Sequence, residues 1–407
     1  MLKTTFALLP TFILLLFHST IFSQSSDLHI IPQPIDAVQK DSLLTGASVL
    51  NDSDRFVWGA SVLKGDDGKY HMLYNTWPCG DSIPQFSDSW VLHSQIAYAI
   101  SDYPDRKFKF QKIILEGKKS FGDTLAWDAQ VVTNPHLKKF KDHYYLYYVG
   151  GRDPGNSPEV VKGSLNKRNR VQQTLRIGVI KFKSFEDLMD GNFIRPQEPL
   201  LSPRTRVKSS NIVYPSPEGT KPKPDNVIVV NPAVVHRPSD GKYLMYFKGN
   251  FYDPYWRGVH GLAIADEPDG PFLPLDDVVF DFRLDDGRIA SAEDPYVWFH
   301  QKTNHFYAIV KDFSGKITEK EPGLALIVSK NGLYWRKAAQ PLFMKKQVDL
   351  ISGETIKLHR LERPQLLTDN NGEPLVLYTA TSIVNINPRT DGKSFNLHIP
   401  LKVQVGQ

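Results

Sequence analysis

Residues 231–247 read NPAVVHRPSDGKYLMYF. An Asn-Pro dipeptide opens a short apolar strand, the polar turn Ser239-Asp240-Gly241 follows it, and an aromatic strand from Tyr243 to Phe247 closes the unit. Aspartate and glycine suit such a turn, because they tolerate positive φ or form hydrogen bonds with their own backbone. The stretch therefore predicts a β-hairpin.

The same unit occurs five times along the chain. Its openings are Gly59-Ala60, Asn134-Pro135, Asn231-Pro232, Asp294-Pro295 and Arg363-Pro364, and each aromatic strand ends 14 to 16 residues later. One supersecondary unit copied at nearly constant length is the sequence pattern of a propeller. Helical periodicity is nearly absent and no linker separates independent domains. The sequence therefore predicts an all-β fold, a single five-bladed β-propeller over residues 24–407 with a funnel-shaped central pocket.

Further strands complete each unit. A third strand of alternating small and apolar residues follows in the first four units, for example residues 96–100, and a weaker fourth strand comes after it. Residues 394–400 complete the last unit. The Gly- and Pro-containing insert 151–173 is expected to be a loop, and residues 185–189 form at most one helical turn.

The N-terminal residues 1–23 have the pattern of an export signal. Lys3 supplies a positive start, Phe6 to Phe17 is mostly apolar, and Ile21-Phe22-Ser23 resembles a cleavage site. The apolar run is too short for a convincing membrane span, and an uncleaved anchor is the alternative. Cys79 is the only cysteine, so neither a disulfide framework nor a lipid-modified cysteine is available. We expect a secreted or periplasmic protein that is free of the membrane after cleavage.

The formal net charge of +5 is a modest excess, and it is partly local. Basic residues crowd two inserts, the first with Lys162, Lys167, Arg168, Arg170 and Arg176 and the second with Arg204, Arg206 and Lys208. These inserts are either solvated loops or a rim that attracts an anionic substrate. Aromatic and basic residues do not alternate along one face and the chain is expected to be exported, so nucleic acid is not an expected partner.

Acidic residues gather near the predicted blade openings. Asp128 and Asp225 each lie six residues before an Asn-Pro opening. Glu293 and Glu362 directly precede the last two openings, and Asp54 precedes the first. The innermost strands of a propeller begin near its centre, so these segments are expected to meet around one pocket. Paired carboxyl groups, one protonated and one ionised, suit glycoside hydrolysis. The structural alternative is that each acid holds a turn or pairs with an arginine.

The repeated unit, with acids at successive openings, resembles the five-bladed propeller glycoside hydrolases of families 43, 32, 62 and 117 and the family 130 phosphorylases, over about residues 50–400. These families place an Asp base on the first blade, a helper Asp on a middle blade and a Glu acid on the next. The resemblance implies that Asp225 is the helper and Glu293 the general acid. The first opening, Trp58-Gly59-Ala60-Ser61, lacks the expected Asp, so Asp128 or Asp54 has to serve as the base.

Aromatic and polar residues near the openings complete the candidate sugar site, because tryptophan stacks on the apolar face of a pyranose. The candidates for substrate binding are Asp54, Trp58, Trp77, His93, Trp127, Asn134, His136, Asn231, Lys248, Asp294, Glu362 and Arg363, with Trp256 as a further stacking residue. The alternatives stay open. An indole between blades is at least as often part of the hydrophobic core, and a histidine often has a structural role. Lys248 suits an exposed ion pair or a contact with a sulfate or carboxylate group.

The leading hypothesis is a secreted, exo-acting glycoside hydrolase. It releases a terminal sugar, for example anhydro-galactose or another α-linked residue, from plant or algal oligosaccharides. Inversion is the expected outcome, because most of the resembling families invert. The alternatives are a polysaccharide lyase, for which Tyr98, Tyr148, His93 and His136 are candidate bases, and a catalytically silent carbohydrate-binding propeller.

No cofactor is expected. The Ser, Cys and His residues suggest no nucleophilic triad, the chain has no phosphate loop of the pattern Gly-x-x-x-x-Gly-Lys-Ser/Thr, and no His/Cys spacing suits zinc. A hydrated calcium ion in the central pocket stays open, although no local loop motif supports one. The expected partner is an oligosaccharide or polysaccharide, neutral or anionic.

Overall fold

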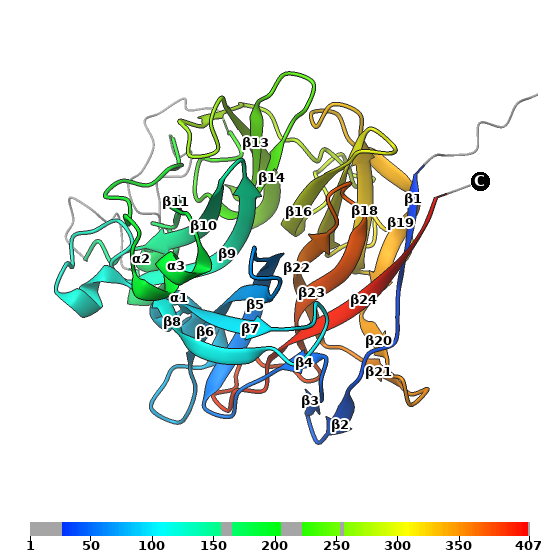
Figure 1. Ribbon diagram of the computed structural model, residues 1–407. Helices are drawn as coiled ribbons and strands as arrows, with labels where there is room; N and C mark the ends of the chain where they lie inside the picture. Colours follow the sequence, from blue (N-terminus) through cyan, green and yellow to red (C-terminus); the bar gives the residue numbers. More distant parts are fainter. Residues whose placement is uncertain (1–26, 156–164, 205–221, 253–255, 406–407) are drawn as a thin grey trace, which may run out of the picture.

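The computed structural model describes residues 27–155, 165–204, 222–252 and 256–405, and antiparallel sheets arranged around one axis make up most of it (Figure 1). The first strands of the five main sheets contact one another in a closed ring: β5 (Arg55–Lys64), β9 (Val131–Phe140), β12 (Val230–His236), β16 (Ala292–His300) and β22 (Arg360–Thr368). The predicted all-β fold, a five-bladed propeller, is confirmed. The expected export signal, residues 1–23, lies outside the described residues.

The blades grow outward from these first strands by antiparallel pairing. Blade 1 continues with β6 (Tyr70–Pro78), β7 (Gln95–Ser101) and β8 (Lys109–Leu115), and blade 2 continues with β10 (His143–Gly151) and β11 (Arg176–Phe182). Blade 3 continues with β13 (Tyr243–Tyr252), β14 (Trp256–Ala265) and β15 (Leu273–Pro274). Blade 4 continues with β17 (His305–Asp312), β18 (Gly323–Ser329) and β19 (Arg336–Lys345). In the described part of blade 2, a single bridge between Ile177 and Leu201 stands where the other blades have a fourth strand.

Blade 5 combines strands from the two ends of the described chain. β22 is followed by β23 (Pro374–Ser382) and β24 (Phe395–Val405). The N-terminal strand β1 (Leu28–Pro32) pairs with β24, and the two-residue strand β4 (Val49–Leu50) pairs with it as well. Sequence reasoning missed β1, because this strand stands outside the repeated unit. Its pairing with β24 closes the propeller without a covalent link (Figure 1).

Shorter elements lie in the connections between strands. They are the hairpins β2 (Val38–Lys40)–β3 (Leu43–Thr45) and β20 (Gln347–Asp349)–β21 (Thr355–Lys357), the helices α1 (Phe86–His93), α2 (Lys167–Gln172) and α3 (Phe185–Asp190), and a 3-10 turn at Lys118–Phe121. Helix α3 is slightly longer than the single turn predicted there. The prediction of a loop over residues 151–173 is wrong for α2, which begins after the capping residue Asn166. None of the described helices is long and apolar enough to cross a membrane.

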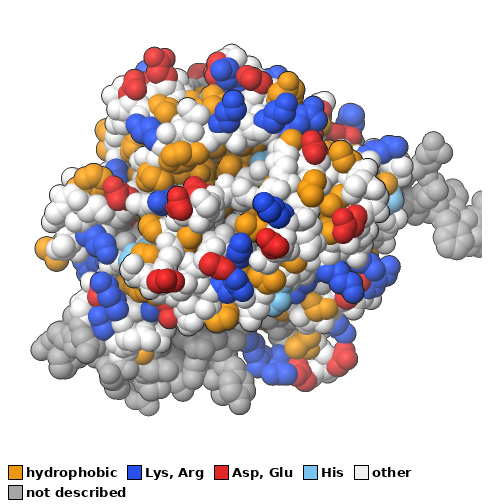
Figure 2. Space-filling view, turned by 90° about the horizontal axis from the view of Figure 1, so that it is seen from below, with side chains coloured by type: hydrophobic (Ala, Val, Ile, Leu, Met, Phe, Trp, Pro, Cys, Tyr) orange, Lys and Arg blue, Asp and Glu red, His pale blue; other side chains and the backbone are white. Residues whose placement is uncertain are grey.

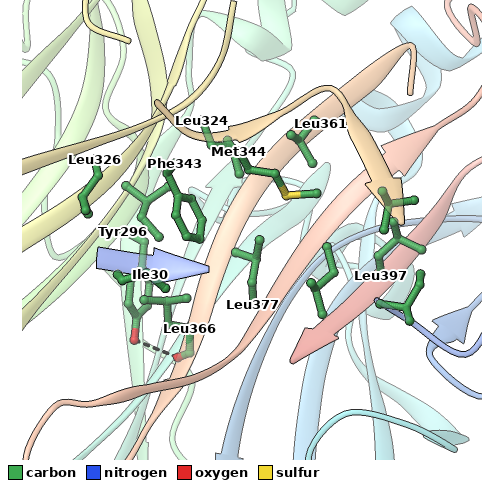
Figure 3. Packing of buried hydrophobic residues seen from close by; sticks show 14 of the residues in the cluster. Ile30, Tyr296, Leu324, Leu326, Phe343, Met344, Leu361, Leu366, Leu377 and Leu397 are labelled. Carbon is green, nitrogen blue, oxygen red and sulfur yellow. Dashed lines mark hydrogen bonds between the residues drawn. The ribbon is translucent and has the colours of Figure 1, made fainter. Parts of the chain in front are cut away.

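Apolar side chains fill the spaces between neighbouring blades. Figure 3 shows the cluster between blades 4 and 5, where Leu324, Leu326 and Leu377 are almost completely buried. Each such side chain contributes about 1.5–3 kcal/mol to folding. The Tyr296 hydroxyl group donates a hydrogen bond of 2.9 Å to the Leu366 carbonyl group, so this buried hydroxyl group is satisfied and joins β16 to β22. This packing fixes the first strands relative to one another, and those strands position the site.

The last four blade openings adopt a left-handed backbone conformation. The angle φ is 54° at Asn134, 55° at Asn231, 56° at Asp294 and 53° at Arg363, and a proline follows each residue. The strand register shifts at the opening of all five blades. A left-handed residue other than glycine costs about 1–2 kcal/mol, and Asn and Asp tolerate it better than Arg. Bulges of this kind re-aim side chains, and here they do so at the same place in each blade.

Candidate active site

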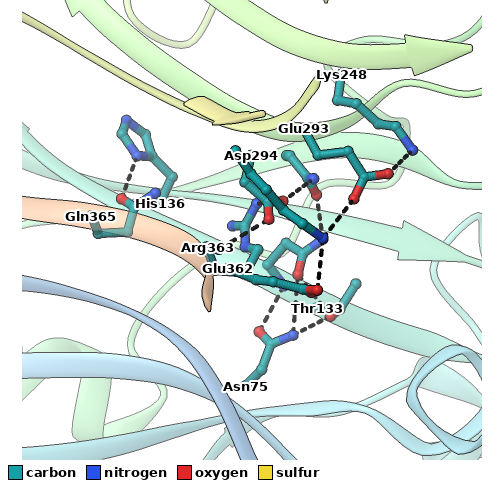
Figure 4. Close-up of polar contacts among 12 residues, drawn as sticks. Asn75, Thr133, His136, Lys248, Glu293, Asp294, Glu362, Arg363 and Gln365 are labelled. Atoms are coloured by element: carbon teal, nitrogen blue, oxygen red, sulfur yellow. Dashed lines mark hydrogen bonds and ion pairs between the residues drawn. The ribbon is translucent and has the colours of Figure 1, made fainter. Parts of the chain in front are cut away.

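The opening residues meet in a chain of polar contacts near the propeller axis (Figure 4). Asn134 Nδ2 donates to Asn231 Oδ1 at 2.5 Å. Asn231 Nδ2 donates to Asp294 Oδ1 at 2.6 Å, and the Arg363 backbone N–H donates to Asp294 Oδ2 at 3.0 Å. Asn75 of blade 1 accepts a hydrogen bond of 2.7 Å from the Asn134 N–H. The openings therefore lie together as predicted, and we call this set of residues the axial ring.

Gly59 completes the axial ring between blades 5 and 1. A β-carbon at this position would lie 2.8 Å from Arg363 Cβ and 3.1 Å from Arg363 Nε. These distances are too short for atoms in ordinary contact, so a side chain at position 59 would displace Arg363. Glycine leaves room for Arg363, whose Nη1 donates to Asp294 Oδ1 at 3.4 Å.

The axial ring lines a cavity of about 200 Å³, here called the axial cavity. Nine of the residues predicted for the site line it: Trp58, Trp77, Asn134, Asn231, Lys248, Glu293, Asp294, Glu362 and Arg363. A second cavity of about 470 Å³ shares Gln172, Ile228, Lys248 and Glu293 with the first, so the two are adjacent. Their combined size falls in the range of about 300–1,000 Å³ that is usual for small-molecule sites.

Charged side chains of alternating sign contact one another at the axial cavity. Lys248 Nζ lies 2.8 Å from Glu293 Oε1, and Lys311 Nζ lies 3.9 Å from Glu293 Oε2. Lys311 Nζ also donates to Glu362 Oε1 at 2.7 Å, and Arg360 Nη1 donates to the same oxygen at 2.9 Å. One ammonium group therefore lies between the carboxylates of blades 4 and 5. We call Glu293 and Glu362 the carboxylate pair.

The two lysines keep Glu293 ionised. Burial opposes its ionisation, but Lys248 and Lys311 outweigh burial and hold the pKa of Glu293 below its ordinary value of 4.5. Burial likewise opposes the charge of Lys311, yet Glu362 and the two acids of blade 4 raise the pKa of this lysine. Glu293 is thus a carboxylate at neutral pH in the free protein. A general acid must carry a proton, so these charges oppose the role predicted for Glu293, which stays a prediction.

Asp294 serves the axial ring instead of the carboxylate pair. Burial raises the pKa of Asp294, Arg363 opposes this effect, and Glu293 adds to it. Its two oxygens nevertheless accept three hydrogen bonds, one from Asn231 and two from Arg363. The Asp294 side chain therefore acts only as an acceptor in these three hydrogen bonds, and they join blades 3, 4 and 5.

Asp128 and Asp225 lie outside the lining of both cavities. Asp128 is fully buried, lies 2.8 Å from Arg195 Nε and accepts a hydrogen bond from the Tyr148 hydroxyl group. Asp225 is also fully buried, and Arg204 contacts its two oxygens at 2.5 and 2.8 Å. These contacts match the structural alternative, in which an acid pairs with an arginine. The catalytic roles of the two acids stay predictions, without a contact to the cavities in their support.

His136 is a structural residue at the centre of the propeller. Its Nε2 accepts a hydrogen bond of 2.9 Å from the Val234 N–H, so the proton resides on Nδ1, which donates to Gln365 Oε1 at 3.0 Å. Burial lowers the pKa of His136 to about 3, so the ring is neutral at pH 7. Its nitrogens are occupied in joining blades 2, 3 and 5, and they do not line either cavity.

The other predicted binding residues outside the cavity linings are Trp127, His93 and Asp54. Trp127 is buried in blade 2 and donates a hydrogen bond of 3.3 Å to the Pro196 carbonyl group. His93 ends α1, and Asp54 is exposed in a turn before β5. The side chain of Trp256 lies outside the described part of the structure. Among the described residues, no group of three or more His, Cys, Asp or Glu side chains is arranged to hold a metal ion.

Helix α1 contributes aromatic residues that sequence reasoning missed. Phe86 and Trp90 line the axial cavity together with Trp58 and Trp77. The Phe86 and Trp58 rings meet edge to face with centroids 5.0 Å apart, whereas Trp77 is almost fully buried and donates to Ser89 Oγ. The helix lies in the connection between β6 and β7, outside the repeated hairpin, so the repeat holds no signal for it. Aromatic faces of this kind suit the apolar side of a sugar ring.

Lys311 was also missed, although the repeat contains a signal for it. Lys248 pairs with Val230 and Lys311 pairs with Glu293, the residues directly before the openings of blades 3 and 4. The two lysines thus hold the same position in successive blades, and a position-by-position comparison of the units would have found the second one. Arg360 lies two residues before Glu362 in β22, so the alternation of a strand places both on one face.

In the part of the basic inserts that the structure describes, nearby acidic residues neutralise much of the positive charge. Three of their arginines form ion pairs: Arg168 with Asp88 at 3.5 Å, Arg170 with Asp153 at 2.8 Å and Arg204 with Asp276 at 2.6 Å. Lys162, Arg206 and Lys208 lie outside the described residues. On the face in Figure 2, basic and acidic side chains are interspersed and do not form a field of one sign. Recruitment of an anionic glycan by these inserts stays a prediction.

Solved structures share this architecture. Zg3597, a family 117 glycoside hydrolase from the marine bacterium Zobellia galactanivorans, matches with a TM-score of 0.57 and 15% identity over 94% of this chain and 92% of that one. A further glycoside hydrolase matches with a TM-score of 0.55 and 12% identity over 90% and 92% of the two chains. A protein of unknown function from Dyadobacter fermentans matches with a TM-score of 0.52 and 11% identity over 91% and 99%.

No protein-family model and no curated protein sequence matches the chain. At 11 to 15% identity, the common feature is the fold. The resemblance to propeller glycoside hydrolases is therefore confirmed at the level of the fold: the chain has the five-bladed propeller that these enzymes use.

Proposed function

We propose that the protein is a glycoside hydrolase whose working carboxyl groups are Glu293 and Glu362. One observation carries the proposal: these side chains come from neighbouring blades to the wall of one aromatic-lined cavity, with Lys311 between them. Glycoside hydrolysis needs two carboxyl groups beside the scissile bond. The fold shared with solved glycoside hydrolases supports the same class of enzyme.

The contacts of the pair suggest a division of roles. Both oxygens of Glu293 face a lysine, so this side chain suits the ionised base or nucleophile. Two cations also contact Glu362, but both of their hydrogen bonds go to Oε1, and no hydrogen bond in the described part of the chain reaches Oε2. We therefore assign the general acid to Glu362, with its proton on Oε2, in place of the assignment to Glu293 that the resemblance implies.

The arrangement of the cavities favours action at the end of a glycan. Asn134, Asn231 and Asp294 bound the axial cavity at the axis, and the second cavity adjoins it through Lys248 and Glu293. A glycan that enters through the second cavity would place its last sugar against the axial ring. We propose release of a terminal sugar, with anhydro-galactose or another α-linked residue of plant or algal oligosaccharides as the expected product and inversion as the expected outcome.

The proposed place of action is outside the cytoplasm, as the pattern of residues 1–23 predicts. An anionic glycan is compatible with this proposal, because cationic side chains stand among the carboxylates of the axial cavity.

A carbohydrate-binding propeller without catalysis is the second candidate. It is favoured by the pairing of every carboxylate that lines the axial cavity, Glu293, Asp294 and Glu362, with a cation. A polysaccharide lyase has less support. Such an enzyme uses a Tyr or His base, and neither residue type is found among the described residues that line the two cavities.

A panel of plant and algal oligosaccharides tests the proposal. Each is incubated with the purified protein, and the products are followed by reducing-sugar assay, ultraviolet absorbance and NMR of the first-formed anomer. We expect a monosaccharide with no 4,5-unsaturated product. The double variant E293Q/E362Q, purified in the same way, should release nothing. An unsaturated product would establish a lyase, and tight binding without turnover would establish the binding propeller.

A further inference from the structure

Positive charge exceeds negative charge around the axial cavity. The described cations that line it are Lys248, Arg360 and Arg363, and the carboxylates are Glu293, Asp294 and Glu362. Lys311 does not line the cavity but contacts two of these carboxylates, so it is the fourth cation of the cluster. His260, which pairs with Lys248 across the sheet, adds no charge at neutral pH, because burial lowers the pKa of this histidine to about 3. The described groups therefore leave one positive charge without a counter-charge.

Of the two lysines, Lys248 has more unused donors. An ammonium group has three N–H donors, and the one ion pair of Lys248 in the described part of the chain is the 2.8 Å contact with Glu293. Its side chain is 12% exposed and lines both cavities. Lys311, by contrast, lies between two carboxylates. The excess charge is thus accessible at the junction of the two cavities.

A bound anion would remove this excess. A partly buried cation without a full counter-charge lowers the stability of the site, and a bound neutral sugar would not compensate this charge. A carboxylate or sulfate oxygen would accept charge-assisted hydrogen bonds from the ammonium group. The second cavity, of about 470 Å³, offers space beside Lys248, and Gln172, Asn250 and Ser291 surround that space with amide and hydroxyl groups suited to sugar hydroxyls.

We propose that Lys248 binds the carboxylate or sulfate group of an acidic sugar residue at the junction of the two cavities. The ligand class is therefore an acidic glycan, recognised inside the site and not by the basic inserts. Cleavage of that glycan rests on the proposed function, whereas its binding does not. With the anionic group on Lys248, the neighbouring glycosidic bond would lie beside Glu293 and Glu362.

Calorimetric titration with three monosaccharides tests this inference without turnover. Galacturonate, galactose 6-sulfate and galactose are titrated into the wild-type protein, and the two charged sugars separate carboxylate from sulfate recognition. We expect at least one of them to bind about tenfold or more tightly than galactose, as a hydrogen bond to a charged group implies. Lys248→Met should abolish this preference, and Lys248→Arg should retain it.

Lys242→Met is the matched control, because Lys242 forms an exposed ion pair with Asp266 on the surface of blade 3. This variant should keep the wild-type preference, and thermal melting should show that every variant is folded. Equal binding of the three sugars, no binding of either charged sugar, or a preference that survives Lys248→Met would each overturn the inference. A protein that binds acidic sugars through Lys248 but cleaves no glycan would contradict the proposed function alone. Hydrolysis without charge preference would contradict the present inference alone.

Discussion

Glu293 and Glu362 directly precede a blade opening and line the axial cavity, whereas Asp128 and Asp225 lie six residues before an opening and are fully buried. The first two share one ammonium group, and among the described residues no hydrogen bond reaches Glu362 Oε2. The other two are each held by an arginine. An acid directly before the bulge therefore lines the axial cavity, whereas an acid six residues before the opening is buried in an ion pair with an arginine.

The largest effect is expected from removing the charge of the carboxylate pair. Glu362→Gln removes the proposed proton donor and Glu293→Gln its ionised partner, so each should lower kcat by about 10²- to 10⁴-fold. Steady-state kinetics on a glycan that the wild-type enzyme cleaves measures this. Glu319→Gln, in an exposed ion pair with Lys337, is the control and should keep the wild-type kcat. Near-normal turnover by Glu362→Gln would return the general acid to Glu293.

In the buried aspartate–arginine pairs, the exchange of a carboxyl group for an amide should lower stability and leave catalysis unchanged. Asp128→Asn leaves Arg195 without its counter-charge, and removing one partner of a buried ion pair costs about 3–5 kcal/mol. Urea unfolding should show this loss in the free energy of unfolding, while the folded fraction keeps its kcat. A variant that loses activity but not stability would instead support Asp128 as the catalytic base.

Lys311 connects the carboxylate pair to the pH dependence of stability. The pKa of Glu293 is lowered in the folded protein, so its ionisation stabilises the fold above the unfolded value of about 4.5. That contribution is lost as the pH falls through the lowered pKa. Lys311→Met removes one of the two lysines responsible, so it should reduce the free energy of unfolding by about 2 kcal/mol at pH 7 and by less near pH 3.

Urea unfolding of Lys311→Met and the wild type at both pH values measures this difference. Lys337→Met, which removes a half-buried lysine paired with the exposed Glu319, should have little effect at either pH. A loss of stability that is the same at pH 7 and pH 3 would mean that Lys311 acts through packing alone.

The smallest effect is expected at the closure of the axial ring. Gly59→Ala places a methyl group where Arg363 packs and should cost about 1 kcal/mol, because overpacking forces the neighbour to shift. In an Arg363→Gly background, which removes the β-carbon as well, that cost should disappear, so a double-mutant cycle in urea isolates the contact. Equal costs in the two backgrounds would show that the clash is with another part of the chain.

The fold could be predicted because its signal is local and repeated. An opening dipeptide, a polar turn and an aromatic strand specify one hairpin, and five copies at similar spacing specify the ring. The same signal placed Asn134, Asn231, Glu293 and Glu362 at the axis, because residues at the bulges of a propeller are brought together by its symmetry.

The rest of the site depends on contacts between blades, for which a local pattern holds no signal. His136 resembles a catalytic histidine in sequence until Val234 and Gln365 occupy both of its nitrogens. The aromatic residues of α1 belong to an insertion outside the repeat. Strand β1 pairs with β24 from the opposite end of the described chain. Each of these features follows from packing that only the folded chain creates.

A crystal structure of the Glu362→Gln variant with a glycan that the wild-type enzyme cleaves tests the assignment of the working carboxyl groups to Glu293 and Glu362. We expect the terminal sugar to occupy the axial cavity beside Trp58 and Phe86. Its glycosidic oxygen should lie within hydrogen-bonding distance, about 2.6–3.2 Å, of the side chain at position 362. A glycan bound outside this cavity, or one whose glycosidic bond lies beyond the reach of both positions 293 and 362, would contradict it.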